Sequence, residues 1–292
     1  AGGVREATGA LREGAADFPT PPASVGPWSL RGGSTRRCRL PPLPAPPVMI
    51  ATRVCFGPLS SHPDTRERQI DLADSYLASL FKNGQASADQ MDAREIGLHV
   101  VYTSLARPDA HEKQFASEWS RRDVDKVAEA FGQPPEWTLL DDEPEAFAKE
   151  DWRGAPSLVL YTTWSAENDL IARGDDSEEI ALYLLPVPDQ TREHLVHWGM
   201  HYRDLDRIWL SSGDLEIAAY KQLVEPDSTL MEEGRDLART VEEATGLATY
   251  VYLFRYWGRR TNEEARRCPG CGEAWFVGGD REEGYLKGFA FR

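Results

Sequence analysis

A regular spacing of apolar residues begins only at Met49, and this change of pattern decides where a folded body can start. Residues 1–48 contain nine of the twenty prolines and six arginines against three acidic residues, and their apolar residues follow no period. Such a segment buries too little apolar surface to offset the entropy lost on ordering. We therefore predict a disordered Pro- and Arg-rich extension over 1–48. It is either an addition upstream of a natural start near Met49, which its composition favours, or a proline-rich docking arm.

Residues 49–257 carry the signals of an α+β body in which strands and helices are mixed. The alternation in IATRVCFG predicts a half-buried strand over 50–57, and an amphipathic helix is expected over 64–82. A strand over 95–106 and a helix over 111–132 repeat this order. These two strand-helix units place the body in the α+β class.

The middle of the chain has short apolar runs separated by acidic segments. EWTLL (136–140), PSLVLYTTW (156–164) and IALYLLPVP (180–188) each predict a strand. A helix with Trp and Tyr on its buried face is expected over 191–209, and the apolar run LEIAAYKQLV (215–224) follows it. The mixed pattern of the first half therefore continues.

The clearest helix signals lie in the segment TLMEEGRDLARTVEEATG, residues 229–246. Ser228 is a suitable N-cap, and Gly246 is a suitable stop because glycine readily takes the left-handed conformation at a helix end. The next segment, ATYVYLFRYW, predicts an aromatic strand over 248–257. We expect this strand to be the last element of the body.

The net charge of -15 limits the partners that the body can have. Most of such a surface repels a polyanion, so any contact with nucleic acid has to be local. The sequence contains no run of eighteen apolar residues and no signal-peptide pattern at its amino terminus. We therefore predict a cytoplasmic protein without a membrane partner.

Cys268 and Cys271 form a CxxC pair within CPGCGEAWF, and this spacing favours metal or redox chemistry. A redox pair is expected at a helix start within a thioredoxin-like unit, whereas Pro269, Gly270 and Gly272 here predict a tight turn. A CPxCG turn points backbone amides at thiolate sulfurs, which favours zinc. Two unligated thiols are the remaining alternative, because structural zinc needs four ligands.

The segment after the cysteine pair resembles the strands of a zinc ribbon. EAWFVG and YLKGFAFR are separated by the polar turn GGDREEG. A ribbon places its second CxxC about 15–20 residues after the first, and residues 272–292 supply 21 positions without one. We therefore expect an incomplete zinc-ribbon-like tail over 258–292, with zinc as its cofactor.

Several segments together resemble a known family. IALYLLPVP, HWGMHYRDLDRIWL, TGLATYVYLFRY and CPGCGEAW are similar to an uncharacterised bacterial family of zinc-ribbon-containing proteins for which nucleic-acid binding has been suggested, and the likeness spans most of 49–292. The resemblance implies a zinc ribbon in the tail, and it implies architecture more than mechanism. Members of the family continue past a segment like GFAFR into a second cysteine pair, which this sequence lacks, so the remaining zinc ligands stay open.

One helical segment suggests an alternative function, a metal-dependent hydrolase. Its candidate ligands are three histidines and two nearby carboxylates: His194, His197, His201, Asp204 and Asp206. Histidines four residues apart on a helix can chelate a metal ion. However, there is no HExxH motif, and Trp198 and Tyr202 are interleaved with the histidines. These features favour a packed structural helix.

The tail is locally basic, with eight basic against six acidic residues between 254 and 292. The candidate nucleic-acid contacts are arginines and one tryptophan near the cysteine pair: Arg255, Arg259, Arg260, Arg266, Arg267 and Trp275. Guanidinium groups beside aromatic rings suit single-stranded nucleic acid. The alternative is a solvated linker whose arginines pair with Glu263 and Glu264, and the acidic body favours it.

We therefore expect a non-catalytic binding protein whose tail contacts nucleic acid or a protein partner. A further alternative is an interaction module in which two copies each supply one cysteine pair to a shared zinc ion.

Overall fold

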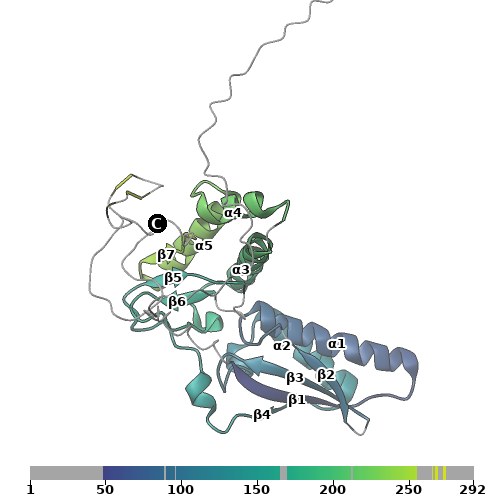
Figure 1. Cartoon of the computed structure of the whole chain (residues 1–292). Helices are drawn as coiled ribbons and strands as arrows, with labels where there is room; N and C mark the ends of the chain where they lie inside the picture. The colour runs from purple at the N-terminus through teal and green to yellow at the C-terminus, as the bar shows by residue number, and fades with distance from the viewer. Residues whose placement is uncertain are drawn as a thin grey trace, which may run out of the picture. The chain divides into compact units, whose positions relative to one another are not determined.

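The computed structural model describes most of the chain between Met49 and Phe254 and a few residues near the cysteine pair (Figure 1). The described residues are 49–88, 90–95, 97–164, 170–211, 213–254, 265, 267–268 and 272–273. The predicted extension over 1–48 and the predicted ribbon strands after Glu273 lie outside them. The described residues have the mixed α+β architecture that the sequence predicts.

The first half of this body is a four-stranded antiparallel sheet with two helices packed against it (Figure 1). Its elements are β1 (Ile50–Pro58), α1 (Pro63–Lys82), β2 (Met91–Glu95), β3 (Leu98–Leu105), α2 (Glu118–Phe131) and β4 (Glu136–Leu139). The strands lie in the order β2-β3-β1-β4. This connection order, β-α-β-β-α-β, is that of the ferredoxin-like split βαβ motif.

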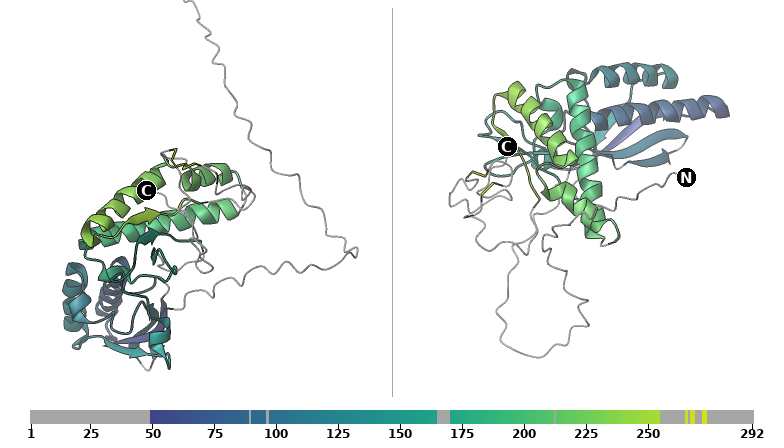
Figure 2. Two further views of the ribbon diagram at one scale, coloured as in Figure 1. Left: turned by 90° about the vertical axis from the view of Figure 1, so that its left-hand side faces the viewer. Right: turned by 90° about the horizontal axis from the view of Figure 1, so that it is seen from above.

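Alternating apolar residues explain why α1 and α2 cover the sheet. Val54 and Phe56 on β1 are two residues apart, so both side chains point to the same face. They pack with Leu77 of α1 and Val127 of α2 in one buried cluster. The views in Figure 2 show the two helices side by side. The first core therefore lies between this helix pair and the sheet.

Two elements of the first half differ from the sequence predictions. The predicted helix over 111–132 begins at Glu118, because Ser117 caps it by accepting a hydrogen bond from the Ser120 N–H. The residues before the cap form only a short 3-10 turn at Lys113–Phe115. Strand β2 has the polar sequence MDARE and was not predicted, since its pairing with β3 defines it.

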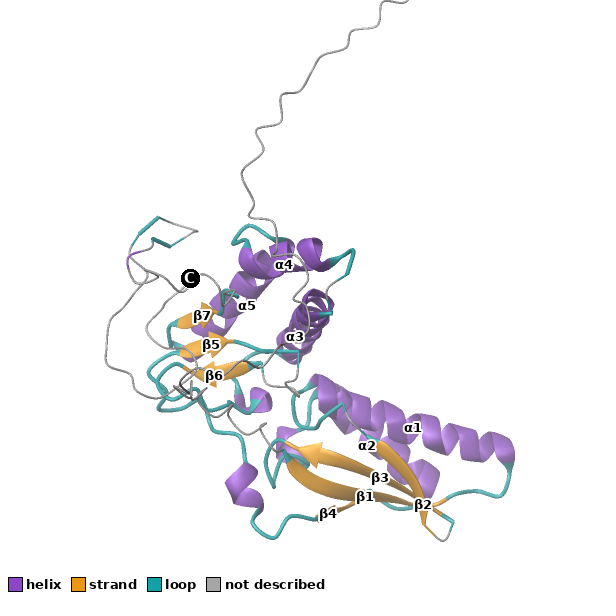
Figure 3. Cartoon of the chain, in the orientation of Figure 1, coloured by secondary structure: helices purple, strands orange, loops and turns teal. Residues whose placement is uncertain are grey.

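The second half combines a three-stranded sheet with three helices (Figure 3). Its elements are β5 (Leu158–Leu160), β6 (Ile171–Arg173), α3 (Asp189–Leu210), α4 (Glu216–Val224), α5 (Thr229–Thr245) and β7 (Thr249–Val251). Strand β5 lies in the middle, antiparallel to β6 and parallel to β7. Trp198 of α3 is fully buried in this second core, where its indole N–H donates to the Leu230 carbonyl at 3.0 Å.

The predicted strand over 180–188 is wrong. The segment contains a 3-10 turn at Leu182–Leu184, and its alternate side chains enter different cores. Ala181 and Tyr183 pack in the first core, whereas Leu182 and Leu185 pack in the second. The run is apolar throughout because it lies between two cores, and its two prolines cannot donate to a strand ladder.

The second sheet is shorter than the sequence predicts. The predicted strand over 156–164 contains three strand residues, at β5, and the described part of the strand predicted over 248–257, residues 248–254, contains three, at β7. Strand β6 lies in a segment expected to be an acidic connection. None of the helices in the described part of the chain combines the length and apolar composition that a membrane crossing requires.

Candidate metal sites

Cys268 lies in a tight backbone turn that faces the second core. Its N–H donates to the Glu273 carbonyl at 2.7 Å, and the Gly272 N–H donates to the Cys268 carbonyl at 2.8 Å. Gly272 has φ of +75°, in the left-handed region that favours glycine. The Cys268 side chain is 7% exposed and packs in the same cluster as Val251. The two hydrogen bonds join Cys268 to Gly272 and Glu273 at the other end of the cysteine segment, whereas residues 269–271 of the predicted turn lie outside the described residues.

Arg267 is the described member of the predicted nucleic-acid contacts. It is exposed beside the cysteine turn, and its Nη1 donates to the Gly272 carbonyl at 3.1 Å. The other candidates lie outside the described residues: Arg255, Arg259, Arg260, Arg266 and Trp275. Cys271 also lies outside them, so the distance between the two sulfurs is untested.

The three histidines of α3 lie on the surface side of the helix. His194 and His201 are exposed and His197 is half-buried, whereas Trp198 and Tyr202 are in the second core. Within the described residues, these histidines belong to no group of three metal-ligating side chains whose donor atoms converge. The structure therefore does not assemble the predicted α3 metal centre from the described part of the chain.

Asp206, the buried carboxylate of α3, also joins no converging group of metal ligands among the residues that the structure describes. Its side chain is 4% exposed and accepts a hydrogen bond from the Trp164 N–H at 2.9 Å. Burial raises the pKa of this carboxyl group, and the Trp164 N–H opposes the shift. Asp206 therefore anchors the connection after β5 to the helix.

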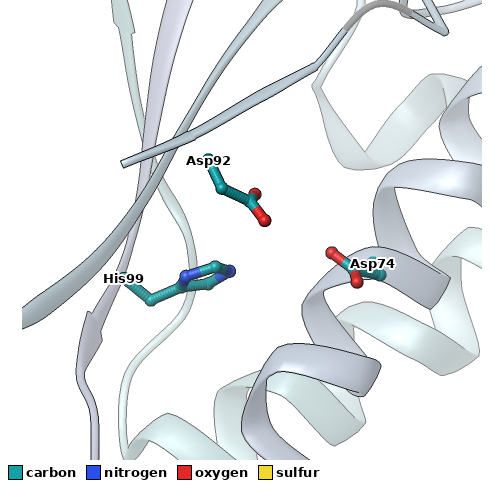
Figure 4. A group of neighbouring side chains, drawn as sticks. All are labelled: Asp74, Asp92 and His99. Carbon is teal, nitrogen blue, oxygen red and sulfur yellow. The ribbon is translucent and has the colours of Figure 1, made fainter. Parts of the chain in front are cut away.

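A different set of ligands converges in the first half of the body. Asp74 of α1, Asp92 of β2 and His99 of β3 direct one donor atom each toward a common space, and these atoms lie within 4.8 Å of one another (Figure 4). Both aspartates are exposed, whereas His99 is 2% exposed. The imidazole thus closes the inner end of the group and the carboxylates form its outer rim.

Sheet pairing brings two of these residues together. Asp92 is paired with Val101 on the adjacent strand, and His99 lies two residues before Val101. Residues two apart on a strand share a face, so Asp92 and His99 are diagonal neighbours. The helix α1 packs over this face and adds Asp74.

The His99 ring is held by two aromatic neighbours. It stacks on Phe56 with 5.3 Å between ring centroids and on Phe131 with 6.2 Å and an interplanar angle of 11°. These rings come from β1 and α2. The imidazole is therefore positioned by the core itself.

The three ligands lie in no sequence motif, and the sequence analysis missed them. Each comes from a different element, and β2 was not itself predicted. Two acidic residues and a histidine spread over one helix and two strands are an unspecific signal. Only the pairing of β2 with β3, together with the packing of α1, could have identified the group.

Part of the chain is similar to uncharacterised proteins. Residues 153–254 match the model of a family described as a domain of unknown function, DUF2310. Two proteins of Haemophilus influenzae described as uncharacterized are also similar. One is 34% identical over 120 residues, covering 40% of this chain and 46% of the relative. The other is 33% identical over 119 residues, covering 40% of this chain and 59% of the relative.

The family model matches only the second half of the body. The matched residues include α3, α4 and α5, but neither Cys268 nor the Asp74 group. The chain spans about half the length of the curated relatives that it matches. No solved structure matches the chain. The family description names no zinc site and no ligand.

Proposed function

We propose that this chain is a non-catalytic zinc-binding protein whose C-terminal tail contacts single-stranded nucleic acid. The observation that carries the proposal is the closed turn around Cys268, with its buried side chain and its left-handed Gly272. Zinc-binding knuckles need such a reversal because two ligands from a few residues must approach the same ion.

Burial of Cys268 supports a structural role for the metal. A thiolate loses water when it is buried, and coordination to a cation offsets that cost. The Cys268 side chain belongs to the same buried cluster as Val251, the last residue of β7, and Leu253. A zinc ion at this position would hold the tail against the second core.

The charge distribution supports a local contact with nucleic acid. The chain as a whole is acidic, with a net charge of -15, whereas residues 254–292 contain eight basic residues against six acidic ones. Arg267 is exposed at the turn, and one carbonyl occupies only one of the five N–H donors of a guanidinium group. Arginines next to aromatic residues favour unpaired bases, which can stack while the phosphates are neutralised.

The zinc proposal is tested by elemental analysis of the purified chain together with its mass in solution. One zinc ion per chain in a monomer means that other residues of the same chain complete the four ligands. One zinc ion per two chains in a dimer means that two cysteine pairs share it. Cys268→Ser removes the metal in both cases. Absence of stoichiometric zinc refutes the proposal.

The nucleic-acid proposal is tested by fluorescence anisotropy with a labelled single-stranded oligonucleotide over a series of salt concentrations. Arg267→Ala is expected to weaken binding and to reduce the slope of log K against log salt by about one unit. Arg121→Ala is the matched control, because Arg121 is an exposed arginine on α2. Equal losses of oligonucleotide affinity in the two variants would indicate nonspecific electrostatic attraction and no binding site at Arg267.

A further inference from the structure

We propose that Asp74, Asp92 and His99 form a binding site for a divalent first-row metal ion. The site lies in the first half of the body, and it is independent of the cysteine turn and of the function proposed for the tail. It would give the chain a second metal centre with a different ligand set.

The geometry of the three donors is close to that of a metal site. Metal bonds to nitrogen and carboxylate oxygen are about 2.0–2.2 Å long, so two ligands of one ion are at most about 4.4 Å apart. The donor atoms here lie within 4.8 Å of one another. Binding of one ion would draw the exposed Asp74 and Asp92 carboxylates slightly closer to His99 (Figure 4).

The site combines a rigid ligand with two adjustable ones. His99 packs against the Phe56 and Phe131 rings, which limits the positions of its imidazole. Both carboxylates are exposed, so an ion can enter from solvent. Three protein ligands leave further coordination positions for water or another small ligand.

The electrostatics of the group favour a cation. Asp74 and Asp92 each direct a carboxylate oxygen toward the same space. Two converging carboxylates repel each other, and a divalent ion between them replaces this repulsion with attraction.

The ligand set selects the class of metal. Mg²⁺ and Ca²⁺ prefer oxygen ligands alone, and thiophilic ions prefer cysteine. One imidazole with two carboxylates suits ions that accept both nitrogen and oxygen, such as Mn²⁺, Fe²⁺ or Zn²⁺. Mn²⁺ is the best probe because it prefers oxygen and nitrogen ligands and binds thiolates weakly, so it should not bind to the cysteines of the tail.

The test is a calorimetric titration of Mn²⁺ alone into the full chain after treatment with a chelator. We expect one Mn²⁺ per chain, with the same affinity in Cys268→Ser. Asp74→Asn and Asp92→Asn are each expected to weaken binding by at least about tenfold, since each removes a ligand charge. Glu67→Gln is the matched control, because Glu67 is an exposed carboxylate of the same helix that is not a member of the group.

The outcomes separate this site from the tail. Loss of Mn²⁺ binding in Cys268→Ser, or its absence in the wild-type chain, refutes the site. Equal weakening by Glu67→Gln and Asp74→Asn also refutes it, because it indicates diffuse attraction to an acidic helix. Zinc lost in Cys268→Ser with Mn²⁺ binding retained supports both sites, and absence of zinc with Mn²⁺ bound refutes only the proposed tail function.

Discussion

Arg192 of α3 donates from Nε to the Oδ1 atom of Asn83 at 2.6 Å, which joins α3 to the residue that ends α1. The same guanidinium group donates to the carbonyls of Leu185 and Val187 and pairs with Asp189. Burial lowers the pKa of Arg192, while Asp189 opposes that shift. One side chain thus connects the first half of the body to the second. It also donates hydrogen bonds to two carbonyl groups of the segment 180–188, which lies between the two cores.

Arg192→Ala is expected to lower the free energy of unfolding by about 3 kcal/mol, because it leaves several buried partners without a donor. Arg192→Lys should recover little of this loss, since an ammonium group lacks the planar fork. The comparison is Arg207→Ala on the same helix, whose ion pair with Asp204 is long and largely exposed. That variant should lose less than about 1 kcal/mol in urea denaturation. Similar losses in the two alanine variants would contradict a special role for Arg192.

Gly234→Ala should destabilise the chain through a clash with a rigid ring. A Cβ atom at Gly234 would lie 2.9 Å from Nε1 of Trp198, whose ring is fully buried. Overpacking costs about 1–3 kcal/mol, while alanine regains about 1 kcal/mol of helix propensity. A net loss of about 1–2 kcal/mol is therefore expected in urea denaturation. Gly213→Ala is the control, because nothing lies within 4 Å of its Cβ position, and a comparable loss there would argue against the clash.

Asp206 should make stability depend on pH. Burial raises its pKa in the folded state, so the folded chain holds a proton that the unfolded chain releases. Its contribution to stability is therefore present below the unfolded pKa of about 3.9 and is lost as the pH rises through the folded pKa. Asp206→Asn cannot titrate, so wild type should lose stability relative to this variant as the pH rises from about 4 to about 7. A pH-independent difference between the two unfolding free energies would show that Asp206 has no such shift.

His197→Ala distinguishes the binding protein from the alternative hydrolase. His197 is half-buried on α3, and within the described residues it joins no converging group of metal ligands. We expect its zinc content and its oligonucleotide affinity to equal those of the wild-type chain. Cys268→Ser, in contrast, should lose zinc. Loss of zinc in His197→Ala would assign a ligand role to the α3 histidines and would reopen the catalytic alternative.

Local signals predicted the elements whose ends are set by their own residues. Ser228 caps α5 and Gly246 ends it, as expected, because a cap hydrogen bond and a left-handed glycine act within a few residues. Gly132 ends α2 in the same way. The strand beginning at Ile50 was predicted because one of its faces is buried and its apolar residues alternate.

Elements that depend on distant partners were not predictable in this way. β2 and β6 are strands because β3 and β5 pair with them, and neither has a strong pattern of its own. The proposed metal ligands Asp74, Asp92 and His99 belong to the same category, since their convergence needs the sheet order and the packing of α1.

The sequence by itself determined the α+β class and the ends of α2 and α5 at Gly132 and Gly246, because periodicity, capping and glycine conformation are properties of neighbouring residues. The tertiary structure alone decided which apolar runs became strands and which polar side chains converged in space. The segment 180–188 shows the reason: a run buried between two cores has the same composition as a buried strand, and only the surfaces on either side of it determine its conformation.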